Sequence, residues 1–208
     1  MWRSGYAIDD VVMKILAVIT ARGGSKGVER KNVRVLNGKP LIIHTIDCAL
    51  SASNLLYKVI VSTEDAEIAD LSVKAGVEVP FLRPAELAAD DTPTLPVLTH
   101  AVRFVEESDN VSLDWVLVLQ PTSPLRLRED IAAAVSLAQT GDFDTIVSVK
   151  NANDHHPLKI KKVNINENLI PFIDGAVEPL RRQDLSPNAY KRNGAIYLIR
   201  RDRLEEGR

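Results

Sequence analysis

Four short apolar runs, separated by segments with helical periodicity, constrain the fold of this chain more than any other feature. The runs are 14–20 (KILAVIT), 58–62 (KVIVS), 115–120 (WVLVLQ) and 144–149 (DTIVSV). Each is rich in β-branched residues and lacks polar alternation, which is typical of strands buried on both faces of a sheet. The runs predict four strands of one mainly parallel sheet.

Apolar residues recur at helical spacing between these runs. Pro40 suits a first helical position, Thr63 an N-cap and Gly76 a helix end. Strand and helix alternate four times, which predicts an α/β fold with helices on both faces of the sheet, a Rossmann-like three-layer arrangement. Such sheets bind ligands beyond the carboxyl ends of their strands. The apolar stripes are Ile42, Ile46, Ala49 and Leu50; Ile68, Leu71 and Ala75; Leu95, Leu98, Val102 and Val105; and Ile131, Ala134, Val135 and Ala138.

A chain of 208 residues with 45% hydrophobic content can bury one full core. We expect residues 1–12 to be an N-terminal extension and residues 13–208 to form the domain. The sequence becomes polar and contains prolines after Lys150, before a last strand-like run at 195–199. Residues 151–192 are therefore expected to form a small excursion or arm.

Composition excludes several classes of partner. The net charge of -2 and a pI near 6.1 supply no basic field for nucleic acid or anionic lipid. No apolar run approaches the roughly 18 residues of a membrane span. The single cysteine, Cys48, cannot form an intrachain disulfide and is interpreted as a packing residue. We expect a cytoplasmic protein that binds neither nucleic acid nor membrane.

The loop after the first predicted strand, residues 21–32 (ARGGSKGVERKN), carries the clearest chemical signal. Its three glycines permit turns in which successive backbone N–H groups point at one anion. The spacings of the Walker P-loop and of the dinucleotide fingerprint are both absent, which disfavours P-loop NTPases and nicotinamide dehydrogenases. The loop predicts a triphosphate site. Its four cations are Arg22, Lys26, Arg30 and Lys31.

A second polar turn, PTSPLR at 121–126, follows the third apolar run. Its two prolines restrict the backbone. The groups that could form hydrogen bonds at this sheet edge belong to Gln120, Thr122, Ser123 and Arg126. The turn is therefore interpreted as the second wall of a cleft.

Six segments, taken in order, resemble the acylneuraminate cytidylyltransferases, also called CMP-sialic acid synthetases. The resemblance implies a nucleotide-diphospho-sugar transferase fold. It also implies that CTP and a 2-keto sugar acid react, with Mg²⁺, to give a CMP-sugar and pyrophosphate. A homodimer is implied too, with residues 151–182 reaching toward the partner. The segments are ARGGSKGVERKN, IVSTED (60–65), LRPAELA (82–88), LQPTSPLR (119–126), HHPLK (155–159) and NGAIYL (193–198).

The same resemblance implies roles for individual residues. Catalysis is expected of Arg22, Lys31 and Gln120. A sugar carboxylate calls for a guanidinium or ammonium partner, for which Lys159 and Arg182 match the family. The expected CTP ligands are Ala21, Arg22, Gly24, Ser25, Lys26, Lys31, Asn32, Arg83 and Thr94, with the stretch 89–94 near the base and ribose. The expected sugar-acid ligands are Gln120, Thr122, Ser123, Lys159, Arg182, Tyr190 and Asn193.

The metal ligands are the point at which the chain departs from the family pattern. The family's Asp-x-Asp pair near the carboxyl terminus is missing before Arg208, and Asp142 and Asp144 form the only such pair. We interpret that pair as a turn feeding a strand. Two explanations are open: a truncated chain, or metal binding through phosphates, water and another carboxylate such as Asp65. We favour truncation and expect the 208-residue form to turn over poorly even with saturating Mg²⁺.

Several alternatives remain open at this stage. The acceptor could be pseudaminic, legionaminic or keto-deoxyoctulosonic acid. A glycosyltransferase would use Asp142 and Asp144 as a metal pair, and a regulatory module would bind CTP without turnover. The adjacent His155 and His156 are expected to have a structural or interface role, because neighbouring histidines rarely converge on one ion.

Overall fold

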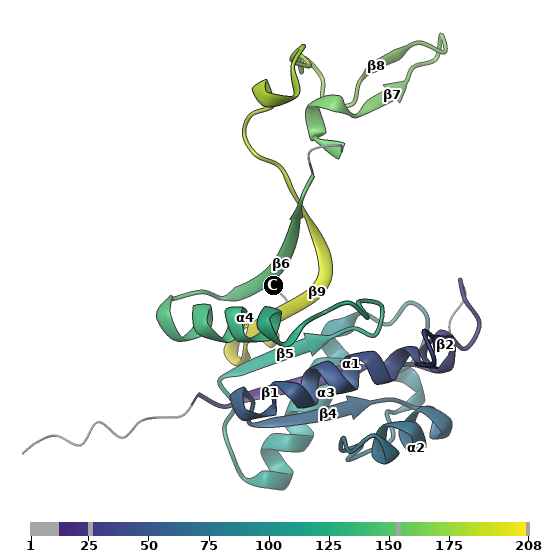
Figure 1. The fold of residues 1–208 in the computed structure, drawn as a ribbon, viewed down its shortest axis with the longest axis vertical. Helices are drawn as coiled ribbons and strands as arrows, with labels where there is room; N and C mark the ends of the chain where they lie inside the picture. The colour runs from purple at the N-terminus through teal and green to yellow at the C-terminus, as the bar shows by residue number, and fades with distance from the viewer. Residues whose placement is uncertain (1–12, 25–26, 153–154, 207–208) are drawn as a thin grey trace, which may run out of the picture. The chain divides into compact units, whose positions relative to one another are not determined.

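A five-stranded sheet forms the centre of the structure, a computed structural model that describes residues 13–24, 27–152 and 155–206. The predicted extension, residues 1–12, lies outside the described residues. The strand order is β4-β1-β5-β9-β6 (Figure 1). The strands are β1 (Ile15–Thr20), β4 (Lys58–Ser62), β5 (Trp115–Leu119), β6 (Thr145–Asn151) and β9 (Tyr190–Arg200).

Strand β1 lies between β4 and β5 and is parallel to both, with Val18 opposite Ile60 on one side and Val118 on the other. Strand β9 is antiparallel to β5. The predicted mainly parallel sheet is confirmed, with one antiparallel strand added beside its parallel core. The carboxyl ends of β1, β4 and β5 therefore meet at one edge of the sheet.

Helices cover both faces of the sheet, as predicted. Residues of β1 alternate between two cores: Ile15 and Ile19 pack in the core that includes α1, α2 and α4, and Leu16 and Val18 pack in the core that includes α3. This two-residue period is the geometry of a strand buried on both sides. The helices are α1 (Leu41–Ser51), α2 (Ala66–Lys74), α3 (Thr94–Asp109) and α4 (Arg128–Thr140).

Two predicted helix starts are wrong by one or two residues. Pro40 precedes α1 instead of opening it, because it pairs in a short ladder between β2 (Val35–Leu36) and β3 (Lys39–Pro40). Thr63 does not cap α2; the Asp65 side chain accepts the Ile68 N–H at 3.0 Å. The Thr63 hydroxyl oxygen instead accepts the Asp65 N–H at 3.1 Å.

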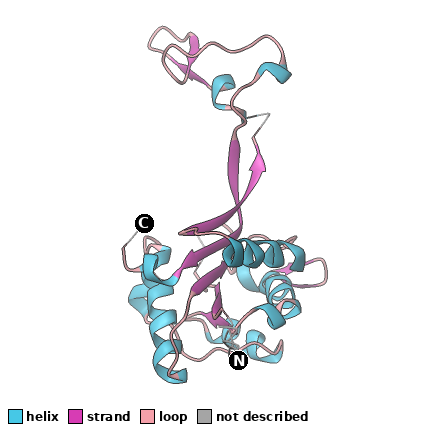
Figure 2. Cartoon of the chain, turned by 90° about the vertical axis from the view of Figure 1, so that its left-hand side faces the viewer, coloured by secondary structure: helices cyan, strands magenta, loops and turns pink. Residues whose placement is uncertain are grey.

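Two compact units divide the chain. The first comprises residues 1–147 and 195–208, and the second comprises residues 148–194. The expected arm, 151–192, falls within the second unit, where loops predominate (Figure 2). This unit contains an antiparallel pair, β7 (Lys161–Val163) and β8 (Leu169–Pro171). Among the described residues, short 3-10 helices include Lys31–Val33, Ser53–Leu55, Ala85–Leu87, Pro157–Lys159, Arg182–Asp184 and Arg201–Leu204.

A helix that spans a membrane requires a minimum length and hydropathy. Across the described ranges, no helix is both long and apolar enough to cross a bilayer.

Candidate active site

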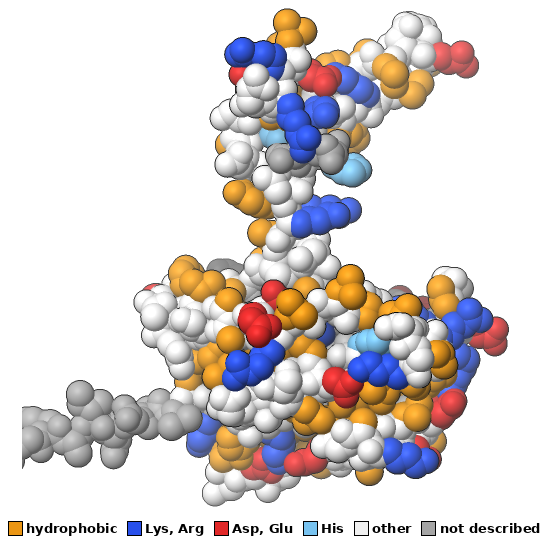
Figure 3. All heavy atoms as spheres, viewed as in Figure 1, with side chains coloured by type: hydrophobic (Ala, Val, Ile, Leu, Met, Phe, Trp, Pro, Cys, Tyr) orange, Lys and Arg blue, Asp and Glu red, His pale blue; other side chains and the backbone are white. Residues whose placement is uncertain are grey.

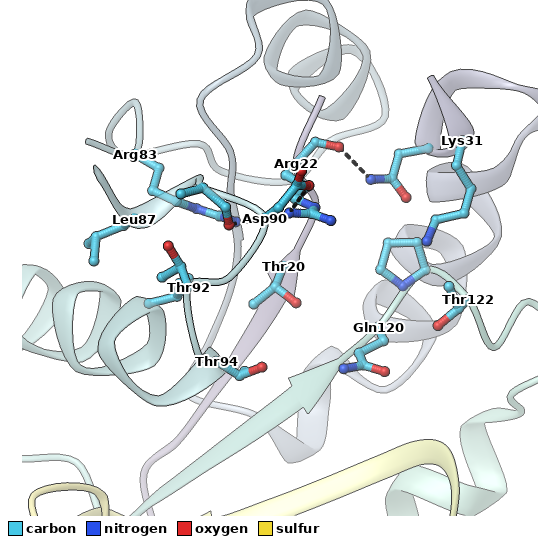
Figure 4. A pocket seen from close by; sticks show the side chains of 14 residues that line it. Thr20, Arg22, Lys31, Arg83, Leu87, Asp90, Thr92, Thr94, Gln120 and Thr122 are labelled. Carbon is cyan, nitrogen blue, oxygen red and sulfur yellow. Dashed lines mark hydrogen bonds and ion pairs between the residues drawn. The ribbon is translucent and has the colours of Figure 1, made fainter. Parts of the chain in front are cut away.

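A cavity of about 310 Å³ opens at the sheet edge where β1 and β5 end (Figure 4). Thr20 is the last residue of β1, Gln120 directly follows β5 and Thr94 begins α3, so the ends of three elements contribute to its walls. The described residues that line it are Thr20, Arg22, Lys31, Asn32, Arg83, Leu87, Ala89, Asp90, Thr92, Thr94, Val97, Gln120, Pro121 and Thr122.

Seven of the predicted site residues line this one cavity, although they are up to 100 positions apart in the chain. Parallel strands bring them together because their carboxyl ends share an edge. The first loop supplies cations on one side, and the turn after β5 supplies an amide and a hydroxyl on the other. The seven are Arg22, Lys31, Asn32, Arg83, Thr94, Gln120 and Thr122.

The other predicted residues of the first unit lie apart from the lining. Ala21 is fully buried in the core and donates its N–H to the Ser62 carbonyl at 3.1 Å. Gly24 is exposed, and Ser123 forms a turn by donating its N–H to the Gln120 carbonyl. Ser25 and Lys26 lie outside the described residues.

Arg22 links the first loop to the segment on the far side of the cavity. Its Nη1 lies 2.9 Å from Asp90 Oδ1 and 3.2 Å from the Ala89 carbonyl oxygen. Figure 4 shows Arg22 and Asp90 together between Arg83 and Lys31. A guanidinium held at the cavity wall is well placed to donate hydrogen bonds to phosphate oxygens.

Asn32 supports the loop from inside. Its side chain is buried, and Nδ2 donates to the Arg22 carbonyl oxygen at 2.8 Å. Arg30, expected among the loop's phosphate-facing cations, instead turns to the start of α2 and pairs with Asp65 and Glu67. That hydrogen bond from Arg30 holds the pKa of Asp65 below its ordinary value. The sequence could not separate Arg30 from the other cations, because only folding brings α2 beside the loop.

Gly23 is the position in this loop that tolerates no side chain. A Cβ there would lie 2.3 Å from Asp65 Oδ2, so a larger residue would displace the α2 cap. The Gly23 N–H donates to Glu64 Oε1 at 2.7 Å. Glu64 and Asp65, which follow β4 at the end of the IVSTED segment, therefore contact the loop.

Arg83 is a buried guanidinium in the cavity wall. Only 6% of the residue is exposed, Nε donates to Ser62 Oγ at 3.1 Å and Nη2 donates to the Ser62 carbonyl. Burial lowers the pKa of Arg83, and the nearby Glu64 carboxylate opposes that shift. An arginine remains charged despite such a shift.

Arg126 corrects one expectation, because it does not face the cavity. The side chain is buried, and Nε donates to the Ala195 carbonyl at 2.6 Å while Nη2 donates to the Gln120 carbonyl at 2.9 Å. Nη1 lies 3.5 Å from Thr45 Oγ1. Arg126 thus holds the 120–126 turn from the interior and positions Gln120.

The remaining predicted ligands belong to the second unit. Arg182 lines a separate hollow of about 360 Å³, together with Asn151, Gln183, Leu185 and Asn188. Asn193 Oδ1 accepts the Ser148 hydroxyl at 2.5 Å. Tyr190 is exposed, and Lys159 ends a 3-10 helix.

His156 has the structural role expected of one of the adjacent histidines. It is buried; its Nε2 lies 2.9 Å from the Pro187 carbonyl oxygen and its Nδ1 accepts the Leu158 N–H at 3.3 Å. Both ring nitrogens therefore serve the local fold of the second unit.

Sequence reasoning missed three lining residues, Thr20, Leu87 and Val97. Thr20 could have been found, because a polar residue at the carboxyl end of a central strand faces the ligand edge. Leu87 and Val97 carry no such signal, since apolar residues in a cavity wall look like core residues in the sequence.

The acidic residues considered for metal binding are engaged elsewhere. Asp142 pairs with Arg200 at 3.0 Å and Asp144 with Arg203 at 2.8 Å, which supports the interpretation of a structural turn. Within residues 13–24, 27–152 and 155–206, no three His, Cys, Asp or Glu side chains group to hold a metal ion.

A mainly parallel sheet covered on both faces, with a cationic cavity at the carboxyl ends of its central strands, is typical of a nucleotide-binding α/β enzyme. Sequence comparison gives the family. The profile of the family described as cytidylyltransferase matches residues 16–206, and the chain belongs to that family. The resemblance stated from the motifs is confirmed, and the protein is an enzyme of the cytidylyltransferase type.

Individual relatives agree with this assignment. The chain is 38% identical over 202 residues to CMP-N,N'-diacetyllegionaminic acid synthase of Legionella pneumophila, covering 94% of this chain and 82% of the relative. It is 34% identical over 186 residues to N-acylneuraminate cytidylyltransferase of Escherichia coli, covering 89% of this chain and 42% of that protein.

A solved structure shares the fold. CMP:2-keto-3-deoxy-manno-octonic acid synthetase, determined in complex with CTP, aligns with a TM-score of 0.63 at 24% identity, over 93% of this chain and 77% of the other. The predicted nucleotide-diphospho-sugar transferase fold is thereby confirmed.

Proposed function

We propose that this enzyme transfers CMP from CTP to a 2-keto sugar acid of the sialic acid type, releasing pyrophosphate. The observation that carries the proposal is the single cavity in which loop cations, a buried arginine and the polar turn after β5 converge. The relatives named as synthases of CMP-legionaminic acid and as N-acylneuraminate cytidylyltransferases support this substrate class.

The reaction requires charge stabilisation above all. The anomeric hydroxyl of the sugar acid attacks the α-phosphorus, an O–P bond forms, the bond from the α-phosphorus to the bridging oxygen breaks, and the hydroxyl proton is released. Negative charge then builds on pyrophosphate. Arg22 and Lys31, both in the cavity wall, would neutralise it. Arg22 would exchange its contact with Asp90 for phosphate oxygens.

The nucleoside part of CTP and the acceptor sugar are proposed to bind at different walls of the cavity. Arg83 and the stretch 89–94 would surround the cytosine and ribose, and Gln120 and Thr122 would face the acceptor sugar. Lys159, Arg182, Tyr190 and Asn193 are retained as predicted ligands of the sugar acid, since its carboxylate requires a cation.

Mg²⁺ is proposed to enter with the triphosphate as part of the substrate. The described side chains provide no ligand set for a resident ion, and Asp65, Asp142 and Asp144 are each paired with an arginine. Mg²⁺ binds typically through substrate phosphates, water and one or two carboxylates.

A homodimer is proposed from the surface of the second unit. Many apolar side chains are largely exposed there, interspersed with charged and polar ones in the view of Figure 3, and exposed apolar surface can mark protein contacts. They include Val163, Ile165, Leu169, Phe172, Val177 and Leu180. We also propose a cytoplasmic location, in which a free cysteine stays reduced. Cys48 is a free, buried cysteine, and burial raises the pKa of its thiol, so it is an inert packing residue.

Pyrophosphate release tests the function. CTP is offered with N-acetylneuraminic, legionaminic, pseudaminic and keto-deoxyoctulosonic acids to the wild type, to Arg22→Ala and to a surface control, Arg103→Ala, whose side chain is 62% exposed. We expect Arg22→Ala to lower turnover at least about 100-fold, as for other groups that stabilise developing charge. The control should match the wild type.

Two outcomes would contradict the proposal. A preference for UTP or ATP over CTP would refute the base assignment. Tight CTP binding, without release of pyrophosphate from CTP in the presence of any of the sugar acids, would indicate a nucleotide-binding module instead. Legionaminic acid is the first acceptor to test, because the relative with 38% identity carries that name.

A further inference from the structure

Ser62 connects two walls of the cavity without lining it. It is the last residue of β4 and is fully buried. Its carbonyl oxygen accepts the Ala21 N–H at 3.1 Å, at the start of the first loop (residues 21–32). The same carbonyl accepts Arg83 Nη2, and the Ser62 hydroxyl oxygen accepts Arg83 Nε at 3.1 Å.

These contacts fix the orientation of Arg83. The Arg83 N–H donates to the Thr63 carbonyl at 2.7 Å, so the main chain is held beside the same strand end. A guanidinium is a rigid planar fork, and fixing its Nε–Nη2 edge fixes the direction of Nη1. Figure 4 shows Arg83 extending from the cavity wall toward the centre.

We propose that Ser62 is a positioning residue for recognition of the base: its hydroxyl holds Arg83 so that Nη1 meets the acceptor atoms of cytosine. The inference rests on the proposed CTP function. Ser62 does not touch the nucleotide and acts only through Arg83.

The chemistry of the pyrimidines makes this orientation selective. Cytosine presents two neighbouring acceptors, O2 and N3, whereas uracil presents O2 beside an N3–H donor. A rigid N–H donor aimed at this edge pairs with cytosine and opposes the uracil N3–H, which leaves buried polar groups unpaired. A loosely held guanidinium could rotate toward O2 alone and would discriminate less.

A buried hydroxyl could also have a purely structural role, and Ser72 provides the matched control. Ser72 is likewise fully buried, and its hydroxyl donates to the Ile68 carbonyl at 2.7 Å within the α2 region, away from the cavity lining. Ser72→Ala removes one buried hydroxyl with no effect on Arg83.

Calorimetric binding of CTP and of UTP is measured for the wild type, Ser62→Ala and Ser72→Ala. We expect Ser62→Ala to weaken CTP binding about tenfold and UTP binding less than about threefold, in line with loss of a hydrogen bond to a charged group. The CTP-to-UTP preference should fall in Ser62→Ala and remain unchanged in Ser72→Ala.

A double-mutant cycle tests whether Ser62 affects the base preference through Arg83. Arg83→Ala should abolish the preference, and adding Ser62→Ala to it should have no further effect on the preference, because Ser62 acts through Arg83. If Ser62→Ala does not fold, Ser62→Cys retains the shape with a weaker acceptor and should show an intermediate preference.

The outcomes distinguish a failure of the proposed role of Ser62 from a failure of the proposed CTP function. An unchanged preference in Ser62→Ala, with a wild type that prefers CTP, overturns the role of Ser62 and leaves the CTP site standing. A wild type that binds neither nucleotide overturns the proposed function, and the inference falls with it.

Discussion

Arg83 and Arg126 are both buried, yet they have different roles because their surroundings differ. Arg83 lines the cavity, whereas Arg126 donates to the carbonyls of Gln120 and Ala195. Both follow a leucine in motif-like segments, and nothing in the residues themselves distinguishes them. The distinction comes from which acceptors the fold places around each guanidinium.

Arg126→Met is expected to destabilise the protein. The substitution leaves two carbonyl oxygens without their buried donor, which costs about 2 to 4 kcal/mol in the free energy of unfolding. Urea denaturation measures it. Arg103→Met, which removes an exposed side chain with one 3.7 Å ion pair, should cost less than about 0.5 kcal/mol. Equal losses in the two variants would contradict a specific role for Arg126.

At the scale of elements, the start of α2 depends on one carboxylate. Asp65 caps the helix at the Ile68 N–H and pairs with Arg30 from the first loop. It also closes over Gly23, where no Cβ fits. The cap therefore joins the helix to the loop that forms the candidate phosphate site.

Asp65→Ala should lower the free energy of unfolding by about 1 kcal/mol through loss of the cap alone. Asp65→Asn retains a capping side chain and removes the charge, so it should cost less. Urea denaturation at neutral pH compares the two. The ranking would be contradicted if Asn were as destabilising as Ala.

The contribution of the Asp65 charge should also depend on pH. The hydrogen bond from Arg30 lowers the pKa of Asp65 in the folded protein, so folding is favoured when the carboxyl is ionised. The stabilisation is present above the ordinary pKa of an aspartate, about 4, and is lost as pH falls through the lowered pKa of the folded protein. The difference between wild type and Asp65→Asn should shrink in urea denaturation at acid pH. A difference that grows on acidification would reverse the assignment.

For the whole molecule, the exposed apolar side chains of residues 148–194 are the main unexplained surface. Leu180 is fully exposed and Val177 is 82% exposed. The homodimer proposed above would remove this surface from water, which is the usual driving force of association.

Leu180→Glu combined with Val177→Glu should shift a dimer toward monomer by at least about tenfold in dissociation constant, because two charges replace apolar contacts. Sedimentation equilibrium measures the shift. Val73→Glu alters an α2 side chain that is 60% exposed in the other unit and should leave the association unchanged. A wild-type chain that is monomeric at all concentrations would disprove the dimer.

The strands and helices could be predicted because their signals are local. Lys58–Ser62 was predicted with the observed bounds, since a β-branched run with no polar alternation has one stable solution in a covered sheet. Helix starts were less certain. Thr63 and Asp65 are both good caps, and burial of Thr63 beside Leu82 decided between them.

By itself, the sequence determined the alternation of strand and helix, the glycine-rich cationic loop at a strand end and the family to which the motifs belong. These depend on residue type and spacing within one segment. Only the tertiary structure decided that Arg30 turns to Asp65, that Arg126 serves the interior and that Ser62 holds Arg83. Each of those choices depends on which distant carbonyls and carboxylates come within hydrogen-bond distance, and packing of the sheet and helices sets those distances.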